Sequence, residues 1–156
     1  MSNPEFVYTT YVKTTPEKLW EAITNPQFAR QYWGGNANFS DWKKGSKWQH
    51  EDTNNGNAVR VAGEVLESTP PKRLVLSWVD PQDATDTSRV SFDIDLVGGL
   101  TRLVVIHNSF KAGSDMAGKV SMGWPLVLSS LKSFLETGEA IDIFAVKAPC
   151  SGTKAA

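Results

Sequence analysis

The chain has 156 residues, with 16 Lys and Arg against 17 Asp and Glu, for a formal net charge of −1. This length suits one domain with its own core, and the absence of a basic stripe argues against binding nucleic acid or an anionic membrane. A single cysteine, Cys150, excludes an intramolecular disulfide and a thiolate metal cluster. The N-terminal sequence has no signal-peptide pattern, and no run of residues is apolar enough to span a membrane. We therefore expect a cytoplasmic protein that does not insert into membranes.

The N-terminal part predicts one strand followed by two short helices. Residues 5–13 are rich in aromatic and β-branched types, which favour a strand. Thr15 is a suitable N-cap, and Pro16 suits the first position of a helix. Asn25 and Pro26 repeat this arrangement, so a second short helix follows the first.

Residues 37–109 change to an alternation of apolar and polar side chains. The segments SKWQHED, AVRVAGEVLES, RLVLSWV, SRVSFDIDLV and LTRLVVIHNS are separated by turn residues, which predicts an antiparallel meander. Phe92 and Ile94 share one strand face, and Asp93 and Asp95 share the opposite face, so one side of the sheet should meet the core.

The same alternation assigns faces in the strand around residue 60. It turns Val59, Val61 and Val65 toward the core and Arg60 and Glu64 toward solvent.

The C-terminal part predicts a long amphipathic helix that ends at Gly138. Pro125 implies either a helix that starts near Ser114 and is kinked, or one that starts at Ser121. One stripe of this helix is apolar and should pack on the sheet: Val120, Trp124, Val127, Leu128, Leu131, Phe134 and Leu135. We expect a single domain over residues 1–140 and a partly disordered tail over residues 141–156. Within the tail, the apolar residues Ile141, Ile143, Phe144 and Val146 should dock on the domain or on a second copy of it.

This order of elements is that of the α+β helix-grip fold. The segments TTPEKLWEAITNPQFARQYWGG, GEVLESTPPKRLVLSW, TRLVVIHNSF and GWPLVLSSLKSFLETG resemble the START-like (SRPBCC) superfamily. Within it they resemble the family named for the C-terminal domain of the activator of the 90-kDa heat-shock protein ATPase. The resemblance covers residues 5–138. It implies a curved antiparallel sheet wrapped around the long C-terminal helix, with two short helices after the first strand and a cavity between the helix and the sheet.

Aromatic residues and two histidines are the candidates for lining such a cavity, because small-molecule pockets combine aromatic walls with a few polar groups. Trp48 shares a strand face with His50, and His107 lies on the inward face of another strand. The predicted ligand-binding residues are Tyr32, Trp33, Trp48, His50, Trp78, His107, Trp124 and Leu128. Ordinary core packing of the aromatic residues and a structural role for each histidine are the alternatives.

The sequence does not predict a catalytic residue, a metal site or a cofactor. Its two histidines and one cysteine lack zinc-site spacing, and His50 and Glu51 point to opposite sides of a strand. Asp93 and Asp95 share a face that should meet solvent. Acid–base chemistry by His50 or His107 stays open, since the resemblance includes cyclases.

Three functions fit these observations. The preferred one is a non-enzymatic carrier or sensor that encloses a small apolar or aromatic molecule. The second is a protein-interaction module with a homodimer or a chaperone as partner, in line with the stress-response role that the resemblance implies. The third is a small-molecule cyclase.

Overall fold

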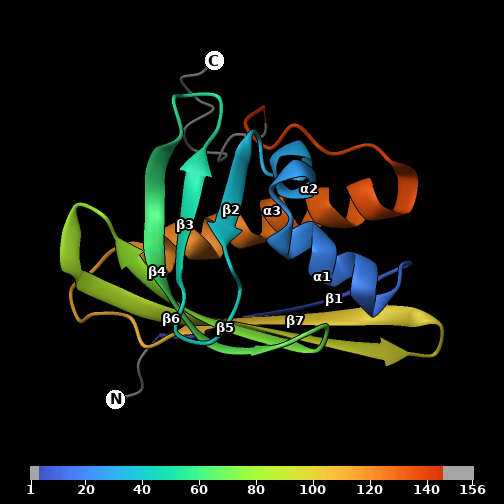
Figure 1. The fold of residues 1–156 in the computed structure, drawn as a ribbon, viewed down its shortest axis with the longest axis horizontal. Helices are drawn as coiled ribbons and strands as arrows, with labels where there is room; N and C mark the ends of the chain where they lie inside the picture. The colour runs from blue at the N-terminus through green and yellow to red at the C-terminus, as the bar shows by residue number, and fades with distance from the viewer. Residues whose placement is uncertain (1–3, 146–156) are drawn as a thin grey trace.

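The computed structural model describes residues 4–145, which form one seven-stranded antiparallel sheet and three helices (Figure 1). The elements in chain order are β1 (Phe6–Val12), α1 (Pro16–Thr24), α2 (Pro26–Tyr32), β2 (Asn36–Ser40), β3 (Lys47–Asp52), β4 (Ala58–Thr69), β5 (Arg73–Asp80), β6 (Asp83–Val97), β7 (Leu100–Asn108) and α3 (Met116–Thr137). The strand order is β1-β7-β6-β5-β4-β3-β2. The expected helix-grip fold is confirmed. No helix within residues 4–145 is both long and apolar enough to cross a bilayer.

The sheet curls so that β2, β3 and β4 rise away from the plane of the other strands, and α3 runs along the concave side (Figure 1). Two irregularities lie in β4. Arg60 is an extra residue opposite the His50–Glu51 step of β3, and the pairing of β4 with β5 shifts between Val65 and Glu67. Such bulges bend a strand and increase its twist, so they account for part of the curvature that leaves space under α3.

Capping side chains determine where the two short helices begin. Thr15 Oγ1 accepts a hydrogen bond of 3.2 Å from the backbone N–H of Lys18, and Asn25 Oδ1 accepts one of 2.9 Å from that of Gln27. Proline follows each cap, as predicted.

Helix α3 begins at Met116, so the earlier of the two predicted starts is correct and Pro125 lies inside the helix. Proline has no N–H, and the carbonyl of Ser121 therefore receives no helical hydrogen bond from position 125. Gly138 ends the helix with a left-handed φ of 86°, and its N–H donates to the carbonyl of Phe134. Of the predicted stripe, Val120, Trp124, Val127, Leu128 and Leu131 are buried, whereas Phe134 and Leu135 are half-buried.

Two strand predictions need correction. Val59 is 37% exposed instead of buried, because the extra residue Arg60 makes Glu51 pair with Val59 while His50 pairs with Val61. The alternation of faces is broken at that point. Residues Asn36–Ser40, which were not among the expected strands, form β2 at the edge of the sheet.

The segment after Gly138 turns back onto the domain. Ser130 Oγ donates to the carbonyl of Ile141 and accepts from its N–H, at 3.1 and 3.0 Å. Ile143 is 8% exposed and belongs to the core, and the ring of Phe144 lies over Gly34. The expected docking is thus confirmed for Ile143, whereas Ile141 and Phe144 stay 39% and 63% exposed. Val146 and the rest of the tail lie outside the described residues, and the division at residue 140 stays a prediction.

Candidate ligand-binding cavity

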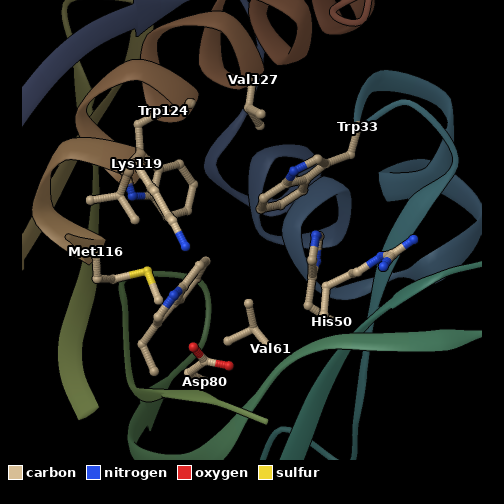
Figure 2. A pocket seen from close by; sticks show the side chains of 12 residues that line it. Trp33, His50, Val61, Asp80, Met116, Lys119, Trp124 and Val127 are labelled. Carbon is tan, nitrogen blue, oxygen red and sulfur yellow. The ribbon is translucent and has the colours of Figure 1, made fainter. Parts of the chain in front are cut away.

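A cavity of about 330 Å³ lies between α3 and the concave face of the sheet. This volume is at the small end of the range for ligand pockets. Figure 2 shows Trp33 and His50 on one side, Met116, Lys119 and Trp124 on the other, and Val61 and Asp80 below them. The lining side chains and backbone come from Trp33, His50, Arg60, Val61, Trp78, Asp80, Met116, Lys119, Val120, Gly123, Trp124 and Val127.

Three tryptophans from three different elements form the aromatic walls. Trp33 directly follows α2, Trp78 lies on β5 and Trp124 lies on α3. The ring centroid of Trp124 is 5.6 Å from that of Trp33 and 5.7 Å from that of Trp78, and both of these rings are tilted relative to that of Trp124. The cavity therefore offers aromatic faces and edges held in place by the closure of α3 over the sheet.

His50 is held in one tautomer by Asn38. The side-chain N–H of Asn38 donates to the carbonyl of Ile23 at 3.1 Å, so the oxygen Oδ1 of Asn38 faces Nδ1 of His50 at 2.8 Å. An amide oxygen only accepts, and Nδ1 therefore carries the proton. Burial lowers the pKa of His50 to about 4, with the Asp52 carboxylate opposing this effect and the Arg60 guanidinium adding to it. At neutral pH, Nε2 is thus an uncharged hydrogen-bond acceptor.

His107 is held in the opposite tautomer. The indole N–H of Trp124 donates to Nδ1 of His107 at 3.1 Å, so Nε2 carries the proton and donates to Ser88 Oγ at 2.8 Å. Burial lowers the pKa of His107 to about 4 as well. Both ring nitrogens have protein partners, which makes His107 a structural residue that orients Trp124.

Charged side chains surround the mouth of the cavity. Arg60 and Lys119 line it while their side chains stay 50% and 62% exposed. Arg60 pairs with Asp52 at 2.9 Å, and Lys119 lies 3.6 Å from Asp115. Asp80 adds a further carboxylate to the lining. The mouth is therefore polar and its two cations are compensated, whereas the interior is mostly apolar.

Comparison with models of known families assigns the chain to one of them. The model of the family described as "Activator of Hsp90 ATPase homolog 1-like protein" matches residues 13–136. The chain belongs to this family. A search of curated proteins found no match.

Solved structures share the fold of this Hsp90-activator-like family member. Protein MLL2253 from Mesorhizobium loti is 25% identical, with 85% of this chain and 96% of that chain covered and a TM-score of 0.72. An Hsp90 activator from Plasmodium falciparum, PFC0360w, is 23% identical over 84% and 95% of the two chains, with a TM-score of 0.71. The Aha1 dimer from Colwellia psychrerythraea is 21% identical over 88% and 99%, with a TM-score of 0.69.

Four of the eight predicted site residues line the cavity of this family member: Trp33, His50, Trp78 and Trp124. The other four lie behind it. Tyr32 donates its hydroxyl to the carbonyl of Ala22 at 2.9 Å, and burial raises the pKa of that hydroxyl. Trp48 donates to the carbonyl of Ser77 at 2.8 Å, and Leu128, like His107, is buried in the core. These four residues support the cavity wall instead of forming its surface.

Sequence reasoning missed several lining residues on α3. Met116, Val120, Gly123 and Val127 lie three or four positions apart and share a helix face with Trp124. That spacing could have identified them once Trp124 was taken as a cavity residue. Arg60 could not have been found in this way, because only the bulge brings it to the cavity.

The acidic pair on β6 is not a site. Asp93 binds Arg73 at 2.6 Å, and Asp95 lies 3.3 Å from Arg102, on the outer face of the sheet, as expected. No group of three potential metal ligands comes together in the part of the chain that the structure describes.

Proposed function

We propose that this protein binds a small apolar or aromatic molecule in the cavity between α3 and the sheet, as a carrier or sensor. The observation that supports this most is a cavity of about 330 Å³ walled by Trp33, Trp78 and Trp124. Tryptophan faces and edges favour offset and edge-on packing with an aromatic ring. A volume of this size suits a molecule of one or two rings.

Tryptophan fluorescence tests this proposal, because three indoles line the cavity. Titration with naphthalene and substituted naphthalenes should give a saturable change in emission at micromolar concentration, about −8 kcal/mol. A panel of such compounds that produced no saturable change in folded, ligand-free protein would overturn the proposal.

Two glycines of α3 provide a matched pair of variants. A Cβ built at either Gly123 or Gly118 meets no atom within 4 Å, but Gly123 lines the cavity and Gly118 does not. Gly123→Leu should fill the cavity and weaken naphthalene binding at least tenfold, about 1.4 kcal/mol. Gly118→Leu makes the same helix substitution and should leave the affinity unchanged. Equal effects of the two variants would place the binding site elsewhere.

A second candidate function is binding to an Hsp90-type chaperone, which the description of the family and of the Plasmodium relative supports. Its test is the rate of ATP hydrolysis by purified Hsp90 with increasing amounts of this protein. Stimulation that saturates would support it, and an unchanged rate without co-sedimentation would reject it. Sedimentation equilibrium of the protein alone would test a homodimer, the form described for the Colwellia relative. A cyclase activity, a cytoplasmic location and a stress-response role stay predictions.

A further inference from the structure

Apart from the charged residues at the mouth, the polar side-chain groups of the cavity lining are the imidazole of His50 and the indole N–H groups of Trp33, Trp78 and Trp124. The N–H of Trp124 is bonded to His107. Nε2 of His50 and the N–H groups of Trp33 and Trp78 have no hydrogen-bond partner among residues 4–145. Buried polar groups normally find partners. Nε2 of His50 is the acceptor in this set, and it indicates what the ligand itself must supply.

Nε2 of His50 can only accept a hydrogen bond, because the proton of the ring is on Nδ1, which donates to Asn38 Oδ1 at 2.8 Å. The amide of Asn38 is held in this orientation because its side-chain N–H donates to the carbonyl of Ile23. The ring packs against Trp33 with centroids 4.6 Å apart. The side chain is 7% exposed, and it lines the cavity. A ligand that meets Nε2 must bring an O–H or N–H group to it.

The indole N–H groups require the reverse. They only donate, so a ligand oxygen or nitrogen with a lone pair satisfies them. The N–H of Trp78 has less than 1 Å² of accessible surface, so Trp33 supplies the indole N–H that a ligand can reach. A hydroxyl group both donates and accepts and so complements His50 and Trp33. A carboxylate or a methyl ether only accepts, and it would leave His50 unsatisfied.

The charges at the mouth do not favour an anion. Arg60 has Asp52 as a partner and Lys119 has Asp115, and Asp80 adds a carboxylate without a basic partner among the described residues. Transfer of a carboxylate into this cavity would therefore cost desolvation free energy without a free cation to offset it.

We propose that the ligand is an uncharged one- or two-ring aromatic molecule that carries a hydroxyl group, and that this hydroxyl donates a hydrogen bond to Nε2 of His50. This inference rests on the proposed ligand-binding function and names its ligand class. His50 is a specificity-determining residue in this scheme, and the tryptophans supply affinity for any aromatic ring of the right size.

The test compares naphthalene, 2-naphthol, 2-methoxynaphthalene and 2-naphthoate at pH 7, by tryptophan fluorescence and calorimetry. We expect 2-naphthol to bind about tenfold or more tighter than 2-methoxynaphthalene, the difference made by one hydrogen bond to a buried partner, with 2-naphthoate weakest. Affinities of 2-naphthol and 2-methoxynaphthalene within twofold of each other, or tighter binding of 2-naphthoate, would overturn the inference. Binding of naphthalene in that case would leave the proposed function standing, whereas no binding by any of the four would reject both.

His50→Leu should reduce the preference for 2-naphthol to within twofold while naphthalene still binds. A retained preference in this variant would also overturn the inference.

Because Asn38 loses its partner in that variant, a measurement on the unsubstituted protein provides a second test. The ¹⁵N resonance of His50 Nε2 should shift on addition of 2-naphthol in the direction of hydrogen bonding and should not do so with naphthalene. An unchanged resonance at saturation with 2-naphthol would again overturn it.

Discussion

The indole N–H of Trp124 donates a hydrogen bond of 3.1 Å to Nδ1 of His107, across the interface between α3 and β7. Trp124 is also in aromatic contact with Trp33, Trp78 and Phe92. The bond therefore orients the side chain that joins the helix to the sheet and to the cavity wall.

Replacement of this indole should show the contribution of the bond. Trp124→Phe leaves the buried Nδ1 of His107 without a donor. This should lower the free energy of unfolding by about 1–3 kcal/mol, in addition to the loss caused by the smaller size of the phenyl ring. Urea denaturation measures the loss. Trp20→Phe is the control, because the half-buried indole of Trp20 has no hydrogen bond within residues 4–145, and its loss should be smaller. Equal losses in the two variants would show that the bond to His107 contributes nothing.

The two buried histidines make stability depend on pH. Both have a pKa of about 4 in the folded protein, below the ordinary value of 6.5, because burial disfavours the charged ring. As the pH falls below 6.5, the unfolded chain takes up protons first, so the free energy of unfolding decreases down to about pH 4. Between pH 6.5 and pH 5 we expect a loss of roughly 2 kcal/mol per histidine. The carboxyl groups with lowered pKa, such as that of Asp52, contribute only at lower pH.

His107→Gln isolates the contribution of one ring. A glutamine amide supplies both an acceptor and a donor in place of Nδ1 and Nε2 but does not titrate. The loss of stability between pH 6.5 and pH 5, followed by urea denaturation, should decrease by about half in this variant. The same loss as in the unsubstituted protein would mean that His107 is not kept neutral by burial.

Gly63 allows Trp48 to lie against β4. A Cβ at this position would meet the carbonyl of Ser77 and lie 2.6 Å from Nε1 of Trp48, the two atoms that form a hydrogen bond of 2.8 Å. Gly63→Ala should therefore destabilise the fold by about 1–3 kcal/mol, as overpacking does in a core. Gly118→Ala is the control, because its exposed helical site is open and alanine should stabilise it by about 0.5–1 kcal/mol. Thermal unfolding of the two variants should thus shift in opposite directions, and a Gly63→Ala variant as stable as the original would contradict the packing described.

Ser130 holds the segment after Gly138 through two hydrogen bonds to Ile141. Ser130→Ala should cost about 1–3 kcal/mol and should raise hydrogen exchange of the Ile141 amide. Ser129→Ala, one position earlier on the exposed face, should change stability by less than about 0.5 kcal/mol. Unchanged exchange at Ile141 in the Ser130 variant would show that Ile143 alone anchors the segment.

Much of the fold could be predicted from residue order because the signals are local. Thr15 and Asn25 cap the helices that follow them, and each cap acts within a few residues of its own position. Alternation along β6 correctly placed Phe92 inward and Asp93 outward, since a strand turns successive side chains to opposite faces. Four of the eight residues expected in the site, Trp33, His50, Trp78 and Trp124, line the cavity.

The remaining features depend on contacts between distant parts of the chain. The extra residue Arg60 in β4 changes which side chains face the cavity, and a bulge arises from the pairing of two strands, not from the residues of one. The tautomers of His50 and His107 follow from Asn38 on β2 and from Trp124 on α3, which only sheet pairing and helix closure bring to the rings. Residue order predicted that both histidines face inward, but a proton on a ring nitrogen is placed by its partner in space. For this reason only the tertiary structure determines that His50 has a free acceptor nitrogen whereas both ring nitrogens of His107 are hydrogen-bonded.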